Sequence, residues 1–326
     1  MKAVWYDRTG GPAVLTHGDL PTPSPAPGEV LVRLAASGVN PSDWKSRSGA
    51  TGRPMAFPRV VPHSDGAGTV EAVGDGVDRA RIGERVWIWN GQWKRAHGTA
   101  AGYIALPAAQ AVRLPENTGF AEGACLGIPA LTALHALLTD GGVSGRSVLV
   151  TGGAGSVGHY TVQFARLLGA SQVLATVSSE EKAAHALTAG ADSTINYRQE
   201  DVPERVAALT GGRGVDRVVE VDVSGNAKML PLLLAPGGIC AAYGANGASA
   251  EIAFGPSIMK GIAFRFFIVY ELDAAQRAAA LGALNGWLEA GLVRHAVAAR
   301  VPLAECAAAH RAVQEGKHIG NVVLDC

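Results

Sequence analysis

The distribution of apolar and polar positions divides the chain into two kinds of segment. In roughly the first 118 residues, short stretches alternate apolar and polar positions, as at 29–35, 68–73 and 85–89, and Gly, Pro, Asp and Ser separate them. Such alternation predicts half-buried β-strands. The proline-rich run at 21–28 predicts an extended surface connection, because proline lacks the backbone N–H that a strand donates. We therefore expect a mostly β, barrel-like domain here.

From about residue 120 the pattern changes to alternating strands and helices. Helices are predicted at 122–138, 179–189, 201–210, 226–234 and 274–290, and strands at 147–150, 172–177, 193–196, 215–221, 238–243 and 264–269. This succession predicts a doubly wound parallel sheet. A strand at 297–302, a helix at 303–315 and a strand at 321–324 resemble the first segment, so we expect the chain to return to its first domain. The expected domains are residues 1–120, residues 121–265 and the returning segment 266–326.

A glycine-rich turn gives the most specific chemical signal. The strand at 147–150 is followed by glycines at 153, 155 and 158, and a helical pattern begins at Val157. Between a strand and a helix, this spacing fits G-x-G-x-x-G. Such glycines permit a tight turn and let backbone N–H groups approach a pyrophosphate at the helix N-terminus. The turn predicts a dinucleotide cofactor; the alternative is an ordinary glycine-rich turn.

The end of the next strand indicates which dinucleotide. An NAD site places a carboxylate about 20 residues after the glycines, where it accepts from the ribose 2′-hydroxyl. Here Ser178 and Ser179 end the strand, and Lys182 lies in the first turn of the next helix. A hydroxyl and a cation suit a 2′-phosphate, so the pattern favours NADPH. The alternative for Lys182 is a solvated helix residue beside Glu181.

Composition narrows the possible partners. The chain has 28 basic and 28 acidic residues and no run of like charge, which argues against nucleic acid or an anionic membrane as the main partner. Its four cysteines have no ligand spacing, so we expect free thiols in a reducing compartment. The chain has no secretory h-region and no apolar run of the ~18 residues that a span needs. We expect a cytoplasmic protein.

Several sequence blocks together resemble a known superfamily. They are Gly10–Leu15, Gly28–Arg33, Gly38–Asp43, Ser64–Gly68, Gly83–Val86, the glycine turn and Gly316–Gly320. In this order they resemble the medium-chain dehydrogenase/reductase superfamily, in its zinc-free quinone oxidoreductase (zeta-crystallin-like) branch. The resemblance covers essentially the whole chain. It implies an α/β fold: a GroES-like β-barrel-type catalytic domain plus a Rossmann doubly wound parallel sheet domain, with the cofactor between them.

The resemblance also implies a set of cofactor-binding residues. The glycine turn holds the pyrophosphate, a second group holds the 2′-phosphate, and a third lines the nicotinamide end. The residues expected in these roles are Asn40, Gly152, Gly153, Ala154, Gly155, Ser156, Val157, Ser178, Lys182, Tyr197, Tyr243, Gly244, Phe267, Ile268, Val269 and Asn321.

Zinc alcohol dehydrogenases are the main rival, and the donor set argues against them. Those relatives carry Cys where this chain has Asn40, and Gly-His-Glu where it has His63-Ser64-Asp65. The imidazole position thus falls on Ser64, whereas a catalytic zinc needs three protein ligands. No cysteine occurs at 87–102, where those relatives carry a four-cysteine lobe, and the histidines other than His63 form no spaced pair. We predict no metal site and expect His63 to be a hydrogen-bonded loop residue.

Without a Lewis acid, substrates that delocalise the incoming electrons are favoured. We predict NADPH-dependent reduction of a quinone or another conjugated carbonyl, with Asn40, Ser42 and Asp43 orienting cofactor and substrate. Lys45 stands where many quinone-reducing relatives carry Tyr, although Trp44 or Trp93 offers a replacement aromatic. This departure favours the alternative of an enone or enoyl double-bond reductase. A non-catalytic NADPH-binding protein, of the crystallin or RNA-binding kind, is the other alternative.

The apolar, β-prone segment 264–270 is placed by the resemblance at the edge of the sheet. An uncovered edge of this kind invites pairing with a second copy, so a homodimer is predicted. The alternative is a strand that a helix covers.

Overall fold

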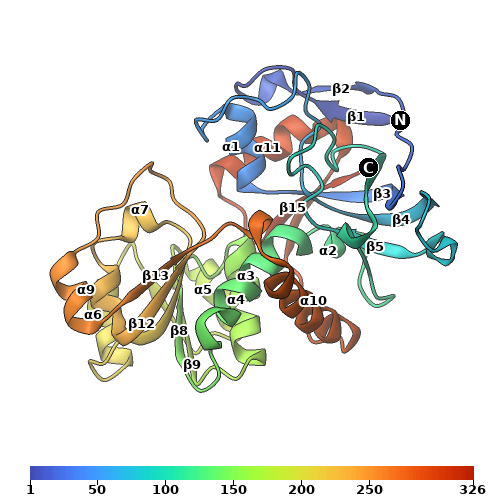
Figure 1. Cartoon of the computed structure of the whole chain (residues 1–326). Coiled ribbons are helices and arrows are strands. Elements are labelled where there is room, and N and C mark those ends of the chain that lie inside the picture. The colour runs from blue at the N-terminus through green and yellow to red at the C-terminus, as the bar shows by residue number, and fades with distance from the viewer. The chain divides into compact units, whose positions relative to one another are not determined.

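The computed structural model describes all 326 residues. The chain forms two compact units: residues 1–128 with 286–326 make the first, and residues 129–285 make the second (Figure 1). The sequence placed the return to the first domain at residue 266, about twenty residues too early. The difference arises because β13 (Ala263–Phe266) pairs within the second unit's sheet, and helix α10 (Ala274–Glu289) starts in that unit.

The second unit contains a six-stranded sheet that is parallel throughout. Its strand order is β10-β9-β8-β11-β12-β13, so the order reverses between β8 and β11. This confirms the predicted doubly wound sheet, in the strand order that binds dinucleotides at the reversal. Besides β13, the strands are β8 (Ser147–Val150), β9 (Gln172–Val177), β10 (Ser193–Asn196), β11 (Val215–Glu220) and β12 (Leu234–Ala242).

Two groups of helices cover this sheet. Helices α3 and α4 contact each other, whereas α6, α8 and α9 form a second contacting group, and Figure 1 shows the groups on opposite sides of the strands. The helices of the unit are α3 (Leu131–Leu138), α4 (Ser156–Leu167), α5 (Glu180–Thr188), α6 (Val202–Leu209), α7 (Val223–Asn226), α8 (Leu230–Leu233), α9 (Phe254–Lys260) and the greater part of α10.

Two predicted helices are broken, and each contains a proline. The stretch 122–138 becomes α2 (Phe120–Gly123), a π-helical turn at Leu126–Ala130 that contains Pro129, and α3. The stretch 226–234 becomes α7 and α8, with Pro231 in the first turn of α8. Proline lacks the N–H that continues a helix, so it is tolerated only near a helix start or at an irregular turn.

The core of the second unit explains why its strands read as continuous apolar runs. All four residues of β8 are buried, because helices cover both faces of a parallel sheet. The core cluster joins Leu149, Leu174, Ile195, Val218 and Cys240, which come from five successive strands. The glycine turn after β8 is therefore anchored to the most buried strand of the unit.

The first unit contains a mixed seven-stranded sheet. Its order is β14-β15-β3-β4-β5-β7, and β6 also pairs with β3. Strands β15 and β3 run antiparallel, so the end of the chain completes the sheet that its start began, as predicted. The strands are β3 (Glu29–Val39), β4 (Asp65–Val73), β5 (Arg85–Ile88), β6 (Tyr103–Pro107), β7 (Ala111–Arg113), β14 (Val297–Pro302) and β15 (Asn321–Asp325).

Three helices and a separate hairpin complete the first unit. Strands β1 (Lys2–Trp5) and β2 (Thr16–Asp19) pair antiparallel. The helices are α1 (Pro41–Ser48), α2 and α11 (Cys306–Glu315), and α1 contacts α11. The proline-rich run between β2 and β3 forms no strand or helix. None of the helices combines the length and apolar character that crossing a membrane requires.

Candidate functional site

The glycine turn of the second unit has the geometry that the sequence predicted. It connects β8 to α4, and Gly152 adopts a left-handed φ of +67°. A Cβ at Gly158 would lie 2.2 Å from the carbonyl oxygen of Gly152, and one at Gly153 would lie 2.6 Å from the Cβ of Ala175. Side chains are therefore excluded by backbone strain and by close packing of the turn against the helix and the next strand.

The start of helix α4 is suited to an anion. Gly155 is the N-cap residue, so no N-cap side chain bonds to the first backbone N–H groups of the helix. The first N–H groups of a helix have no partner within the helix, and the helix dipole favours negative charge there. Ala154, Ser156 and Val157 flank this point. The turn is thus built to receive a phosphate group.

The residues expected at the 2′-phosphate lie at the carboxyl ends of β9 and β10. Ser179 caps helix α5, and its hydroxyl accepts from the backbone N–H of Lys182 at 3.3 Å. The Lys182 ammonium takes part in no ion pair. The N–H of Tyr197 donates to the carbonyl of Val177, the neighbour of Ser178, at 3.1 Å. The structure therefore brings Ser178, Lys182 and Tyr197 to one corner of the sheet.

The remaining expected residues of this unit lie at the carboxyl ends of β12 and β13. Tyr243 directly follows β12, and a Cβ at Gly244 would lie 2.2 Å from the carbonyl oxygen of Val221. The Phe267 ring packs edge-on against His135, with ring centroids 4.5 Å apart. The predicted strand through Val269 ends at Phe266, because Val269 begins a 3-10 turn. Ile268 remains partly exposed beside it.

A buried carboxyl group at the same edge was not singled out from the sequence. Glu220, the last residue of β11, has no exposed surface, and burial raises the pKa of its carboxyl. It accepts from the N–H of Asp222 at 2.5 Å and from the Asn226 amide at 2.9 Å. It thereby holds the turn after β11. The only sequence signal was an acid that ends an apolar run.

In the first unit, Asn40 lies between two buried carboxyl groups. Its backbone N–H donates to Asp43 at 2.7 Å, and its side-chain amide donates to Asp65 at 2.9 Å. Asn40 is also the N-cap residue of α1, where Pro41 is the first helical residue. Ser42 is half-buried in the first turn of that helix. The structure therefore brings Asn40, Ser42 and Asp43 together, and it adds Asp65.

The Asp65 carboxyl group has an unusual environment. It is fully buried in β4; one oxygen accepts from Asn40 and from the N–H of Ile128, and the other has no hydrogen-bond partner. Burial raises the pKa of Asp65 to about 7, against the lowering effect of those two donors. Burial also raises the pKa of Asp43 well above its ordinary value, and the nearby Asp65 adds to the rise. Two acids without a paired cation favour holding a proton here.

Asn321, the other residue expected from this unit, begins β15. Its backbone N–H and its side-chain amide both donate to the carbonyl of Ala296, at 2.8 and 3.2 Å. The residue is buried and follows Gly320, whose φ is +90°. Asn321 therefore holds the first residue of β15 beside the start of β14.

The positions that carry zinc ligands in alcohol dehydrogenases hold other residue types in this chain. Asn40 and Ser64 occupy two of them, and neither is a usual zinc ligand. His63 is buried, and its ring nitrogens lie 2.9 Å from the Ser37 hydroxyl and 2.9 Å from His310. It is hydrogen-bonded, as predicted. The contact between His63 and His310 was not predicted, because the fold joins residues that lie 247 positions apart in the sequence.

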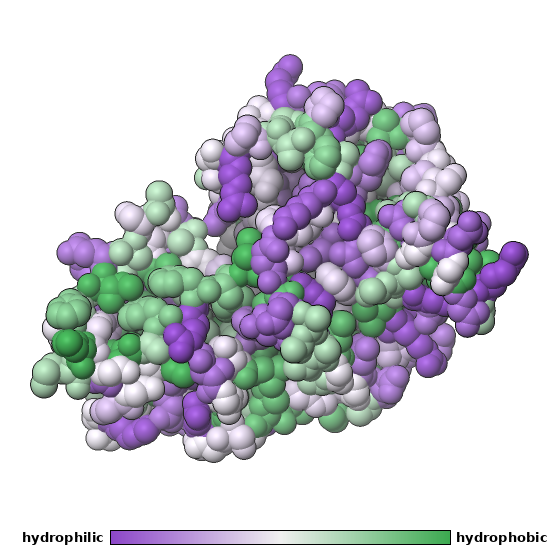
Figure 2. Space-filling model, in the orientation of Figure 1, coloured by the Kyte–Doolittle hydropathy of each residue, from purple (hydrophilic) through white to green (hydrophobic).

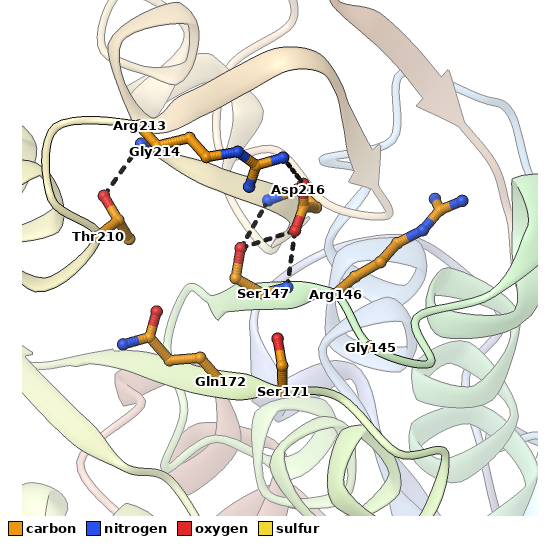
Figure 3. Close-up of a pocket in the computed structure, with 9 residues that line it drawn as sticks. All are labelled: Gly145, Arg146, Ser147, Ser171, Gln172, Thr210, Arg213, Gly214 and Asp216. Atoms are coloured by element: carbon orange, nitrogen blue, oxygen red, sulfur yellow. Dashed lines mark hydrogen bonds and ion pairs between the residues drawn. The ribbon is translucent and has the colours of Figure 1, made fainter.

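A separate cavity of about 430 Å³ lies at the amino ends of β8, β9 and β11 (Figure 3). Asp216 accepts there from the N–H and the hydroxyl of Ser147, both at 2.9 Å, and pairs with Arg213 at 2.6 Å. The glycine turn follows the opposite, carboxyl end of β8. The cavity is thus on the other edge of the sheet, and these polar groups bind one another.

Comparison with known proteins gives the family. Two protein-family models match the chain. The family model described as alcohol dehydrogenase GroES-like domain matches residues 26–116, and the family model described as zinc-binding dehydrogenase matches residues 156–284. The chain is 33% identical to quinone oxidoreductase of Rattus norvegicus over 328 residues, covering 99% of this chain and 97% of the relative. The chain belongs to the quinone oxidoreductase family.

Two further relatives of this family member are informative. It is 33% identical to 2-haloacrylate reductase of a Burkholderia species, which covers 99% of this chain and 98% of that protein. Its structure matches that of Escherichia coli quinone oxidoreductase complexed with NADPH, with a TM-score of 0.90, 27% identity and full coverage of both chains. The predicted superfamily, the GroES-like and Rossmann domains and the oxidoreductase class are confirmed.

Proposed function

We propose that this family member is an NADPH-dependent reductase that transfers hydride to a quinone or another conjugated carbonyl. The observation that carries the proposal is the glycine turn on β8, which leads into the N-terminus of α4 with a glycine as the N-cap residue, an arrangement suited to a phosphate. Relatives of the chain are named quinone oxidoreductase, and the Escherichia coli relative was solved with NADPH. NADPH, when bound, supplies the hydride.

The cofactor residues are proposed as the sequence predicted them. Gly152 to Val157 would hold the pyrophosphate, and Ser178, Lys182 and Tyr197 would hold the 2′-phosphate. Lys182 is the only cation among these three residues and has no carboxylate partner, so its charge remains available for a phosphate. Tyr243, Gly244, Phe267 to Val269, Asn40 and Asn321 would complete the cofactor site.

Residues of the first unit are proposed to orient the reactants. Asn40 is held by Asp43 and Asp65, so its amide is fixed before a ligand arrives. Preorganised polar groups of this kind lower the cost of positioning. Asn40, Ser42 and Asp43 act as orienting groups, because hydride transfer from a nicotinamide cofactor requires no nucleophile from the protein.

The donor set supports metal-independent chemistry. Asn40 and Ser64 offer no strong ligand where alcohol dehydrogenases bind zinc, so a developing alkoxide would lack its usual stabiliser. Quinones and α,β-unsaturated carbonyls delocalise the added electron pair into a phenolate or an enolate. Such substrates therefore fit this chain better than simple ketones do.

Reduction of an activated alkene is the second candidate. Lys45 replaces the aromatic residue of many quinone-reducing relatives, and its ammonium lies 5.9 Å from the Trp44 ring centroid. Trp44 packs against the core of the first unit, so part of that ring serves structure. The relative named 2-haloacrylate reductase acts on a conjugated alkene. A tyrosine at position 45 would stack on the flat ring of a quinone, and Lys45 cannot do so. Its absence favours enone or enoyl reduction over quinone reduction.

The decisive experiment combines binding and turnover. Dissociation constants for NADPH and NADH would be measured by fluorescence, and NADPH oxidation would then be followed with a quinone panel and an enone panel. Tighter binding of NADPH and turnover of one panel support the proposal. Tighter binding of NADH contradicts the cofactor assignment. Tight NADPH binding without turnover would instead favour a non-catalytic protein of the crystallin or RNA-binding kind.

We also propose a homodimer that forms through β13. This strand pairs only with β12, so its other edge is open, and Phe266 next to that edge is 61% exposed. Exposed apolar residues of α8, α9 and the segment after β13 extend the surface, and Figure 2 shows hydrophobic atoms gathered over the α9 region. They are Leu232, Phe254, Ile258, Met259 and Ile268.

The compartment is proposed from the thiols. All four cysteines are free, although the fold buries three of them. Free cysteines are the usual state in a reducing compartment, which fits the cytoplasm. Fractionation of the producing cells would test this assignment, and recovery of the protein outside the cytoplasm would contradict it.

A further inference from the structure

A buried cluster in the first unit has the ligand inventory of a metal site. His63, Cys306 and His310 each expose at most 1% of their surface, and one ligand atom of each lies within 4.8 Å of the others. The two Nε2 atoms of the histidines are 2.9 Å apart, and the Cys306 sulfur is 3.9 Å from Nε2 of His63. Two imidazoles and a thiol are a donor set that zinc and other borderline metals accept.

The hydrogen bonds around the cluster have only one consistent direction. The Thr99 hydroxyl donates to the carbonyl of Asp65 at 2.5 Å, so it must accept from the Ser37 hydroxyl, 2.8 Å away. Ser37 has then used its only proton and must accept from Nδ1–H of His63, at 2.9 Å. His63 is neutral when buried in this way, so its Nε2 is an acceptor.

The hydrogen bond at the other end of this series, between Arg47 and His310, requires the same direction. Nε–H of Arg47 lies 3.3 Å from Nδ1 of His310, and a guanidinium can only donate. Nδ1 of His310 is therefore an acceptor, and the proton of this ring is on Nε2. That N–H donates to Nε2 of His63. Arg47 is fully buried and is held by the Gly10 carbonyl at 2.5 Å and by Gln314 at 3.4 Å.

This arrangement conflicts with metal binding at one atom. A shared metal needs a lone pair on Nε2 of both rings, with the outer nitrogens protonated and donating to acceptors. Ser37 suits His63 in that role, but Arg47 presents a donor and a positive charge to the outer nitrogen of His310. Two tetrahedral zinc ligands would also lie roughly 3.3 Å apart. The observed separation of 2.9 Å between the Nε2 atoms is that of a hydrogen bond.

We propose that Arg47 closes this histidine–cysteine cluster to metals by fixing the proton of His310 on the nitrogen that a metal would need. The side chains of the cluster are those of a metal site, but the positions of their protons make it a hydrogen-bonded structural cluster. The cluster connects β3, through Ser37, to α1 and α11. Its hydrogen bonds continue through Thr99 to the backbone carbonyl of Asp65, the residue whose side chain accepts from Asn40. The inference does not depend on the proposed reductase activity.

The test compares Arg47→Met with Arg47→Lys. Methionine keeps the length of the side chain without charge or donors, whereas lysine keeps a positive charge and a donor. Each full-length protein would be produced in cobalt-supplemented medium, because the cluster is buried, and analysed for bound metal and for absorption by a thiolate–cobalt bond. We expect stoichiometric cobalt and that absorption band in Arg47→Met only. The band should disappear in Arg47→Met combined with Cys306→Ser.

Two outcomes would overturn the proposal. One is stoichiometric cobalt with the thiolate band in the unaltered protein, and the other is a folded Arg47→Met variant that takes up none. Nitrogen-15 NMR of the histidine rings gives a measurement on the unaltered protein that does not need the variant to fold. We expect protons on Nδ1 of His63 and on Nε2 of His310. The reverse tautomer on either ring would refute the closed state.

Discussion

The side-chain amide of Asn40 donates to the carboxyl group of Asp65 over 2.9 Å, although the second oxygen of that carboxyl has no partner. An orphaned oxygen with no exposed surface destabilises the ionised acid more than the neutral one. The contact therefore fixes the Asn40 amide, whereas the burial of Asp65, which outweighs the effect of this donor, favours a proton on the acid. A ligand that reaches Asn40 meets an amide whose orientation an adjacent acid controls.

This relationship predicts a pH-dependent effect of Asp65→Asn. The pKa of Asp65 is raised to about 7 when the protein is folded, whereas the unfolded chain releases this proton near the ordinary value of 3.8. The stability penalty of burying the acid therefore grows as pH rises from the lower value to the upper one and is constant above it. Asparagine cannot ionise. The stability of the variant relative to the original protein should therefore increase between pH 5 and pH 7, by up to ~1.4 kcal/mol per unit. Urea unfolding at both pH values measures this change.

The Asp43 carboxyl offers a second test of the same kind. It is also buried, and the nearby Asp65 raises its pKa further, so loss of this charge effect adds to the pH dependence of Asp65→Asn with the same sign. Asp43→Asn should give a change of the same sign. A stability difference between Asp65→Asn and the original protein that stays constant over the pH range would contradict a neutral Asp65.

A second prediction concerns the glycine turn. Gly158→Ala places a Cβ 2.2 Å from the carbonyl oxygen of Gly152, and neither backbone segment can move without displacing β8 or α4. We expect a loss of about 3 kcal/mol in the free energy of unfolding, together with weaker NADPH binding. Gly282→Ala in α10 is the matched control, since no atom lies within 4 Å of its Cβ position. It should be neutral or stabilise by up to ~1 kcal/mol. Equal stabilities for both variants would be incompatible with the packed turn.

The turn and its strand could be predicted because their evidence is local. Strand β8 is buried on both faces, so its apolar run gave its bounds correctly, and the glycine spacing indicated the turn. The doubly wound parallel sheet also followed from the alternation of strands and helices, whereas the order of its strands was seen only in the structure. Helix α10, by contrast, continues across the boundary after residue 285, so this boundary coincides with no end of a helix or strand that a local pattern could predict.

Long-range polar contacts account for what the sequence left undetermined. Asp65 reads as an ordinary strand residue until β4 pairs with β3 and brings it beside Asn40. His310 lies in the last helix, and only the return of the chain brings it to His63. No spacing rule connects such residues. Local patterns therefore predicted the cofactor turn, but they did not predict the buried acids or the histidine pair.

A third prediction tests the 2′-phosphate corner. Lys182 lies in the first turn of α5 and takes part in no ion pair, so its charge is not offset within the protein. Lys182→Ala should raise the dissociation constant for NADPH about tenfold, the ~1.4 kcal/mol expected from one charge-assisted contact. Binding of NADH, which lacks the phosphate, should change by less than about twofold. Lys228→Ala, which removes an exposed lysine of the same unit, is the control for net charge. Equal losses for both cofactors would show that Lys182 supports the fold and does not read the phosphate.

The last prediction tests the role of β13 in assembly. A dimer formed through this edge buries Phe266, so Phe266→Asp would place a charge at the centre of the interface, where desolvation without a partner is costly. Light scattering should give twice the 33.4 kDa chain mass for the original protein and the single-chain mass for the variant. Leu187→Asp changes an apolar residue of α5 that is 47% exposed, and it should leave the dimer intact. A single-chain mass for the original protein at micromolar concentration would exclude the dimer. A dimer that persists in Phe266→Asp would assign assembly to another surface.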